Sequence, residues 1–112
     1  MQNKTATELV AENQANISEW KEKHKQIKSI TVVSKLNGKQ PFIVGKPTNQ
    51  VLDAVAKYEH EGKVHKINEL LVGSCVLAGN TKLFEEDVDL KNAVLNKVTD
   101  LLERLEVEEK EL

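Results

Sequence analysis

The sequence has little of the material that small domains use for cross-linking or for entering a membrane. Its 112 residues include one cysteine, Cys75, which cannot form a disulfide within the chain. No N-terminal apolar segment has the length of a signal peptide, and the longest apolar run is too short to span a bilayer. These absences predict a protein of a reducing cytosol that makes no membrane contact.

The charge balance argues against nucleic acid as a partner. The chain carries 16 basic and 18 acidic residues, which gives a formal net charge of −2. Such a chain has no net positive field to attract a phosphate backbone, so no nucleic acid is expected to bind. A length of about a hundred residues is typical of one domain with one core, so a single domain is predicted.

Motifs that bind phosphate or carry a nucleophile are also missing. No GxxxxGK[ST], GxGxxG or GxSxG pattern occurs. His24, His60 and His65 are separated by whole predicted elements, and with one cysteine they form no zinc-type spacing. Cys75 lies in an apolar segment, where burial raises the pKa of a thiol, so we interpret it as a small core residue. The sequence therefore predicts no catalytic residue, no cofactor and no metal site, and the protein is not expected to be an enzyme.

The N-terminal part of the chain combines a polar arm with a short amphipathic helix. Residues 1–15 contain few large apolar side chains and are expected to form a flexible arm. A helix over residues 17–25 should follow, because Asn16 can accept a hydrogen bond from the first-turn amides. Trp20 and His24 lie on its apolar stripe. Trp20 either pins this helix onto a sheet or contacts a partner.

A β-hairpin is the next predicted feature. Residues 27–36 are rich in β-branched side chains and partly alternate, as expected for a strand. Asn37 and Gly38 favour a two-residue type I′ turn, because both residues tolerate a positive φ. The return strand should cover residues 39–44. Pro41 has no N–H, so this strand must lie at a sheet edge or place Pro41 at a position without a hydrogen bond.

Three further helices are predicted after the hairpin. Apolar residues recur at helical spacing over 49–60, 64–78 and 88–106. Thr48 or Asn49 should cap the first of these and Asp87 the last, while Gly79-Asn80 should end the middle one.

The segment 64–78 has the longest nearly unbroken run of apolar and small residues, so we expect it to form the centre of the core. Gly73 lowers helix propensity there, which favours close approach of another element at that point. The predicted core comprises Ile30, Val32, Val55, Ile67, Leu70, Leu71, Val94, Val98 and Leu101.

Together these elements predict an α+β fold. An N-terminal helix, one β-hairpin and three helices should pack as a small, mostly helical domain over residues 16–105. Residues 106–112 are mostly acidic and are expected to form a solvated C-terminal extension.

Several short motifs, taken in order, resemble a family of small proteins of tailed bacteriophages, the tail assembly chaperones and proteins encoded beside tail genes. The family pattern is a Trp-Lys helix before a strand, a basic residue with Pro-Thr after a second strand, and Asn-Glu before an apolar stretch with a Cys that ends near Gly. The corresponding residues here are Trp20-Lys21, Lys46-Pro47-Thr48, Asn68-Glu69, Cys75 and Gly79. The resemblance spans residues 17–105. The chain departs from the pattern at Val76, where the family carries an aromatic residue, and at Pro41.

The resemblance implies a non-enzymatic helper in the host cytoplasm. Such a helper keeps the long tape measure protein soluble and recruits tail tube subunits around it, and weak self-association is compatible with this role. Two alternatives stay open: a structural virion or head-tail joining protein that forms a ring, and a small phage-encoded regulator of a host protein.

The partner-binding surface is expected along the open edge of the hairpin and at the end of the last helix. Leu102 and Leu105 lie where few elements remain to cover them. Trp20 is a secondary candidate, since its indole N–H could donate to a partner.

Overall fold

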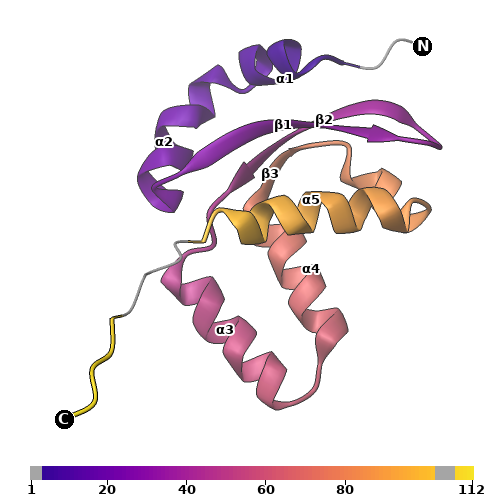
Figure 1. The fold of residues 1–112 in the computed structure, drawn as a ribbon. Coiled ribbons are helices and arrows are strands. Elements are labelled where there is room, and N and C mark those ends of the chain that lie inside the picture. The colour runs from indigo at the N-terminus through magenta and orange to yellow at the C-terminus, as the bar shows by residue number, and fades with distance from the viewer. Residues whose placement is uncertain (1–3, 103–107) are drawn as a thin grey trace.

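The computed structural model describes residues 4–102 and 108–112, which form a three-stranded antiparallel sheet with helices on both faces (Figure 1). In chain order the elements are α1 (Ala6–Glu12), α2 (Gln14–His24), β1 (Ile27–Ser34), β2 (Gly38–Gly45), α3 (Asn49–His60), α4 (Val64–Cys75), β3 (Val76–Gly79), the 3-10 helix η1 (Thr81–Glu85) and α5 (Val88–Asp100). The predicted α+β class is confirmed. The described residues contain one α-helix and one strand more than the sequence predicted.

The helices lie on two sides of the sheet. Figure 1 shows α1 and α2 on one face and α5 on the other, while α3 and α4 form a helical hairpin that extends away from the sheet beyond α5. The α3–α4 pair, residues 49–75, is called the helical hairpin below.

The strand order is β1-β2-β3, so β2 is the central strand. Pro41 therefore lies in the centre of the sheet and not in an edge strand. It pairs with Thr31 of β1, and its carbonyl oxygen faces the end of β3 at Gly79. Because the nitrogen and the carbonyl of a strand residue face the same side, the missing N–H of Pro41 removes no hydrogen bond to β1. Of the two predicted options for Pro41, an edge strand or a position without a hydrogen bond, the second is the one that the structure shows with respect to β1.

The turn between β1 and β2 differs from the predicted type I′ turn. Residues 35–37 form the turn, and Ser34 pairs with Gly38. Gly38 has a φ of 71°, but Asn37 does not have a positive φ. The backbone N–H groups of Leu36 and Asn37 donate to the Ser34 hydroxyl at 3.2 and 3.1 Å, which holds a longer turn. The predicted β-hairpin is thus confirmed, and the prediction of a two-residue type I′ turn was wrong.

The main core lies between β2 and α5. Phe42 and Val44 of β2 pack with Val94 and Val98 of α5, and all four side chains are fully buried. Phe84 of η1 stacks on Phe42 with 5.4 Å between the ring centroids. The other buried members of the cluster are Cys75, Leu90 and Leu101.

The second face of the sheet is covered by α1 and α2. Ile43 points to this face, because side chains alternate along a strand, and it is buried, as is Leu9 of α1. His24, at the end of α2, is buried with its Nδ1 2.8 Å from the carbonyl oxygen of Lys46. A Cβ atom at Gly45 would lie 2.8 Å from the His24 ring, so glycine at this position lets α2 approach β2.

The centre of the core is not where the sequence placed it. Of the predicted core residues, those buried in the main cluster are Val94, Val98 and Leu101. Those that pack against the cluster while partly exposed are Ile30, Val32 and Leu71. Those that are half-buried outside it are Val55, Ile67 and Leu70. The central strand, covered on both faces, supplies the deepest residues, so the assignment of segment 64–78 as the centre was wrong.

The predicted helix over 64–78 is also too long. α4 ends at Cys75, and β3 then pairs with β2, with Gly79 opposite Phe42. A Cβ atom at Gly79, which has a φ of 124°, would lie 2.3 Å from Phe42 Cδ1. The close approach expected at Gly73 occurs here instead, since an added Cβ at Gly73 meets no atom within 4 Å.

The N-terminal segment contains a helix that the sequence did not predict. Residues 6–12 of the expected arm form α1, whose first turn is capped by the Thr5 hydroxyl at 3.2 Å from the Glu8 nitrogen. α2 begins at Gln14, so Asn16 lies inside it and is not its cap. The few apolar residues of this segment include Leu9, and burial of that one side chain holds α1 on the sheet.

The remaining helix boundaries agree better with the prediction. α3 covers residues 49–60 as predicted, with the Thr48 hydroxyl accepting from the Val51 N–H at 3.3 Å. Asp87 caps α5, as predicted, by accepting from the Leu90 N–H at 3.0 Å. α5 ends at Asp100, before the predicted residue 106, and residues 103–107 lie outside the described residues.

Candidate partner-binding surface

The helical hairpin contains almost no fully buried residues. No residue of α3 is buried, and Cys75 is the one buried residue of α4. Its base is held to the core by Val51, Leu71 and Val72, which pack against the main cluster. Farther from the sheet, the apolar residues on both helices are only half-buried. Two amphipathic helices that cover each other and little else leave apolar surface available to a third helix.

Val64 marks the outer end of this surface. It is the first residue of α4 and is 64% exposed, although valine is usually buried. No periodic pattern in the sequence distinguishes Val64 from the half-buried apolar residues that follow it.

The free edge of β1 is a second surface that a partner could use. Bonded and non-bonded residue pairs alternate along an antiparallel ladder. The Lys46 N–H donates to the Gln26 carbonyl at 2.9 Å, and Pro41, which has no N–H, faces Thr31. The even-numbered residues of β1 therefore bond to β2, and the odd-numbered residues direct their N–H and C=O groups outward. We call the backbone groups of Ile27, Ser29, Thr31 and Val33 the β1 edge.

The β1 edge has no partner within the described part of the chain. No other segment of residues 4–102 and 108–112 hydrogen-bonds to these four residues. Ser29 and Thr31 are exposed, and Val33 is 71% exposed. Free edges of this length are available for pairing with an added strand.

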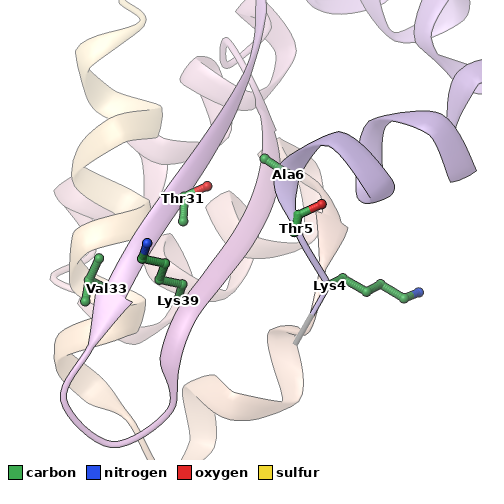
Figure 2. Close-up of a pocket in the computed structure, with 6 residues that line it drawn as sticks. All are labelled: Lys4, Thr5, Ala6, Thr31, Val33 and Lys39. Atoms are coloured by element: carbon green, nitrogen blue, oxygen red, sulfur yellow. The ribbon is translucent and has the colours of Figure 1, made fainter. Parts of the chain in front are cut away.

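An open hollow lies beside the β1 edge on the face that carries α1 (Figure 2). It has a volume of about 550 Å³. Thr31, Val33 and Lys39 line it from the sheet, and residues 4–6 line it from the start of α1. Figure 2 shows Lys39 reaching from β2 toward β1, next to Thr31 and Val33. α1 thus covers only part of this face, and the tip of the β-hairpin stays open.

A hydrogen-bond network fixes the tip of the β-hairpin to the start of α5. The Asp87 carboxylate accepts from the Ser34 hydroxyl and, at 3.0 Å, from the Asn37 side-chain amide. The Gln40 side chain donates to the Asn37 carbonyl at 2.7 Å. The Ser34 hydrogen bond, with those from Leu90 and Asn37, holds the pKa of the buried Asp87 carboxyl below its usual value. These hydrogen bonds therefore hold the tip of the β-hairpin against the start of α5.

The sequence candidates for partner binding do not meet on one surface. Trp20 is half-buried on α2, and Leu102 is half-buried just after α5, so the sheet separates them. Leu102 follows Leu101, which belongs to the main core. Leu105 lies outside the described residues.

The side chains with reactive chemistry lie inside the fold or apart from one another. Cys75 is fully buried, and desolvation raises the pKa of its thiol to about 11, which suits its predicted role as a core residue. Among residues 4–102 and 108–112, no three His, Cys, Asp or Glu side chains are grouped so that they could hold a metal ion. Within the same residues, no helix has the length and apolarity needed to cross a membrane.

Comparisons of the chain with protein-family models, with curated proteins and with solved structures found no match.

Proposed function

We propose that the protein is a non-enzymatic assembly helper of tailed bacteriophages that holds tape measure protein soluble in the host cytoplasm and assists tail tube assembly. The observation that carries this proposal is the helical hairpin. It presents half-buried apolar side chains on two helices that stand away from the core. A protein that holds long amphipathic helices needs such a surface together with a charged exterior that keeps the complex soluble.

The motifs that resemble the chaperone family support the fold that presents this surface. Thr48 caps α3, Cys75 fills the core where α4 ends, and Gly79 lets β3 approach Phe42. Thr48 and Cys75 thus act at the two ends of the helical hairpin, and Gly79 acts in the packing of β3 against β2. The resemblance therefore supports a shared architecture, and the apolar surface supports the holding role.

The test is capture of tape measure fragments by the full chain on co-expression, followed by a pull-down. A Val64→Glu variant should capture less, because it places a charge at the outer end of the apolar surface. Val64 is 64% exposed, so the substitution should leave the fold intact, which circular dichroism can verify.

Val88→Glu is the matched control. Val88 is 61% exposed, but it lies at the start of α5 and not on the helical hairpin. Its substitution makes the same chemical change and should leave capture unchanged. Absence of capture by the unmodified chain would refute the proposed role, and a stable ring formed without any partner would favour a structural virion or head-tail joining protein.

A further inference from the structure

The β1 edge lies within a segment that carries positive charge alone. Between Glu22 and Asp53 the chain has no acidic residue and six lysines. The lysines are Lys23, Lys25, Lys28, Lys35, Lys39 and Lys46. Although the net charge of the whole chain is −2, both strands of the β-hairpin thus carry one sign of charge.

Three of these lysines surround the β1 edge. Lys28 is in β1, Lys35 is in the turn and Lys39 pairs with Val33 across the hairpin. All three are exposed, and no acidic side chain of the described residues forms a salt bridge with them. The acidic side chain that bonds to the tip of the hairpin, Asp87, is occupied by Ser34 and Asn37.

We propose that the β1 edge binds an extended, acidic segment of a partner protein by strand addition. The added strand would exchange hydrogen bonds with the outward-facing groups of Ser29, Thr31 and Val33. Every second side chain of that strand would then face the hollow, where Lys39 can meet a carboxylate. Lys35, in the turn, would meet a carboxylate farther along the strand. Lys28 lies on the opposite face of the sheet, since it pairs with Val44, so it would meet a carboxylate among the alternate side chains of the added strand. Backbone bonds supply affinity in this mode of recognition, and the pocket beside the edge supplies the preference for side chains.

A second copy of the chain fits this edge less well than an acidic partner. β1 contains Lys28 and no acidic residue, so β1 paired with β1 would bring together two strands that carry positive charge alone. Like charges across a strand pair are destabilising, whereas opposite charges stabilise it. The inference rests on the proposed function for the identity of the partner, and it adds the chemistry of the bound segment.

The direct test uses the full chain and a labelled peptide of eight residues in which pairs of glutamates alternate with pairs of valines, so that both faces of the added strand carry carboxylates. Fluorescence anisotropy should show binding that weakens as salt is added. A peptide with lysine in place of glutamate should not bind. A third peptide, N-methylated at every residue, keeps the charge but cannot donate from either edge of the strand, and it should also fail to bind.

Charge reversal on the protein supplies the second arm. The triple variant Lys28→Glu, Lys35→Glu, Lys39→Glu should weaken peptide binding by about tenfold or more, the combined effect of three exposed ion pairs. The matched control reverses the charge of three other exposed lysines, Lys57, Lys66 and Lys97, which lie on α3, α4 and α5. This control variant should weaken peptide binding much less.

The outcomes separate this inference from the proposed function. Equal binding of the N-methylated peptide, equal losses in the two triple variants, or pairing of β1 with a second copy in the absence of peptide would overturn the inference. If tape measure fragments are captured equally well by the β1 triple variant, the inference fails while the holding role stands. If no tape measure fragment is captured but the acidic peptide binds at β1, the holding role fails and the inference stands.

Discussion

Three glycines of this fold should respond to the same substitution in three different ways. Gly73 lies inside α4, does not have a positive φ, and an added Cβ there meets no atom within 4 Å. Gly62 follows α3 with a φ of 73°, and an added Cβ again meets nothing. Gly79 has a φ of 124°, and its added Cβ would overlap Phe42. Substitution by alanine therefore separates helix propensity, backbone strain and steric overlap.

Gly73→Ala should raise the free energy of unfolding. Alanine favours a helix interior over glycine by about 0.5–1 kcal/mol, and no contact opposes the gain. Gly62→Ala should lower the free energy of unfolding by about 1–2 kcal/mol, the usual cost of the left-handed region for a residue with a Cβ.

Gly79→Ala should be the most damaging of the three. The added Cβ would lie 2.3 Å from Phe42 Cδ1 and 2.8 Å from the Pro41 carbonyl oxygen. Phe42 is fully buried against Phe84, and a backbone carbonyl in the central strand has little freedom to move. Overpacking and backbone strain together should cost about 2–5 kcal/mol, a large fraction of the stability of a typical domain.

Urea denaturation followed by circular dichroism and by Trp20 fluorescence measures all three changes. The midpoints should fall in the order Gly73→Ala, unmodified chain, Gly62→Ala, Gly79→Ala, with similar slopes. A loss of stability in Gly73→Ala that grows with protein concentration would show that another chain occupies the open face of α4. A neutral Gly79→Ala would refute the close packing of β3 against β2.

Three further predictions concern titration, reactivity and partner binding. Asp87→Asn should destabilise the fold at neutral pH and much less in acid. The lowered pKa of Asp87 means that its carboxylate stabilises the fold above its ordinary pKa of 3.8, and this stability is lost as the pH falls below that value. Urea midpoints at pH 7 and pH 3 measure the difference. Cys75 should not react with a thiol reagent at pH 8 until urea unfolds the chain. The free energy of unfolding should also fall as the pH rises from 9.0 toward 11, because the native thiol keeps its proton to about pH 11 while the unfolded thiol loses it. Leu102→Glu should weaken capture of tape measure fragments while the circular dichroism spectrum stays unchanged, because Leu102 is half-buried at the end of α5; unchanged capture would remove this end of α5 from the binding surface.

Local signals predicted the parts of the fold that short-range physics determines. The bounds of α3 follow from its apolar period and from Thr48, whose hydroxyl bonds three residues ahead. The same holds for Asp87 and the start of α5. The β-hairpin follows from β-branched residues on either side of Gly38.

Long-range pairing determined the parts that the sequence did not reveal. Residues 76–79 continue the apolar run of α4, and only their pairing with residues 42–44 makes them a strand. That pairing moves β2 to the centre of the sheet and places Pro41 there. α1 was missed because its seven residues contain one buried side chain, Leu9, and the helix is held by packing against β2.

The candidate partner-binding surface also could not be predicted from the sequence, because it depends on how distant segments pair. The run of lysines between Glu22 and Asp53 is visible in the sequence, but its meaning depends on β1 having a free edge. Two of the separately predicted partner-binding residues, Trp20 on α2 and Leu102 after α5, lie on opposite sides of the sheet, which no spacing along the chain could have shown.

The place of α5 in the chain has a consequence for synthesis on the ribosome. Phe42 and Val44 emerge long before Val94 and Val98, the residues that cover them in the finished core. A two-stranded hairpin is marginal in water, and the carboxylate that ties its tip belongs to Asp87, which is made 53 residues after Ser34. The nascent chain therefore exposes an apolar strand pair until α5 leaves the exit tunnel, and in that interval the lysines between Glu22 and Asp53 are the charged groups that oppose pairing of this strand pair with another chain.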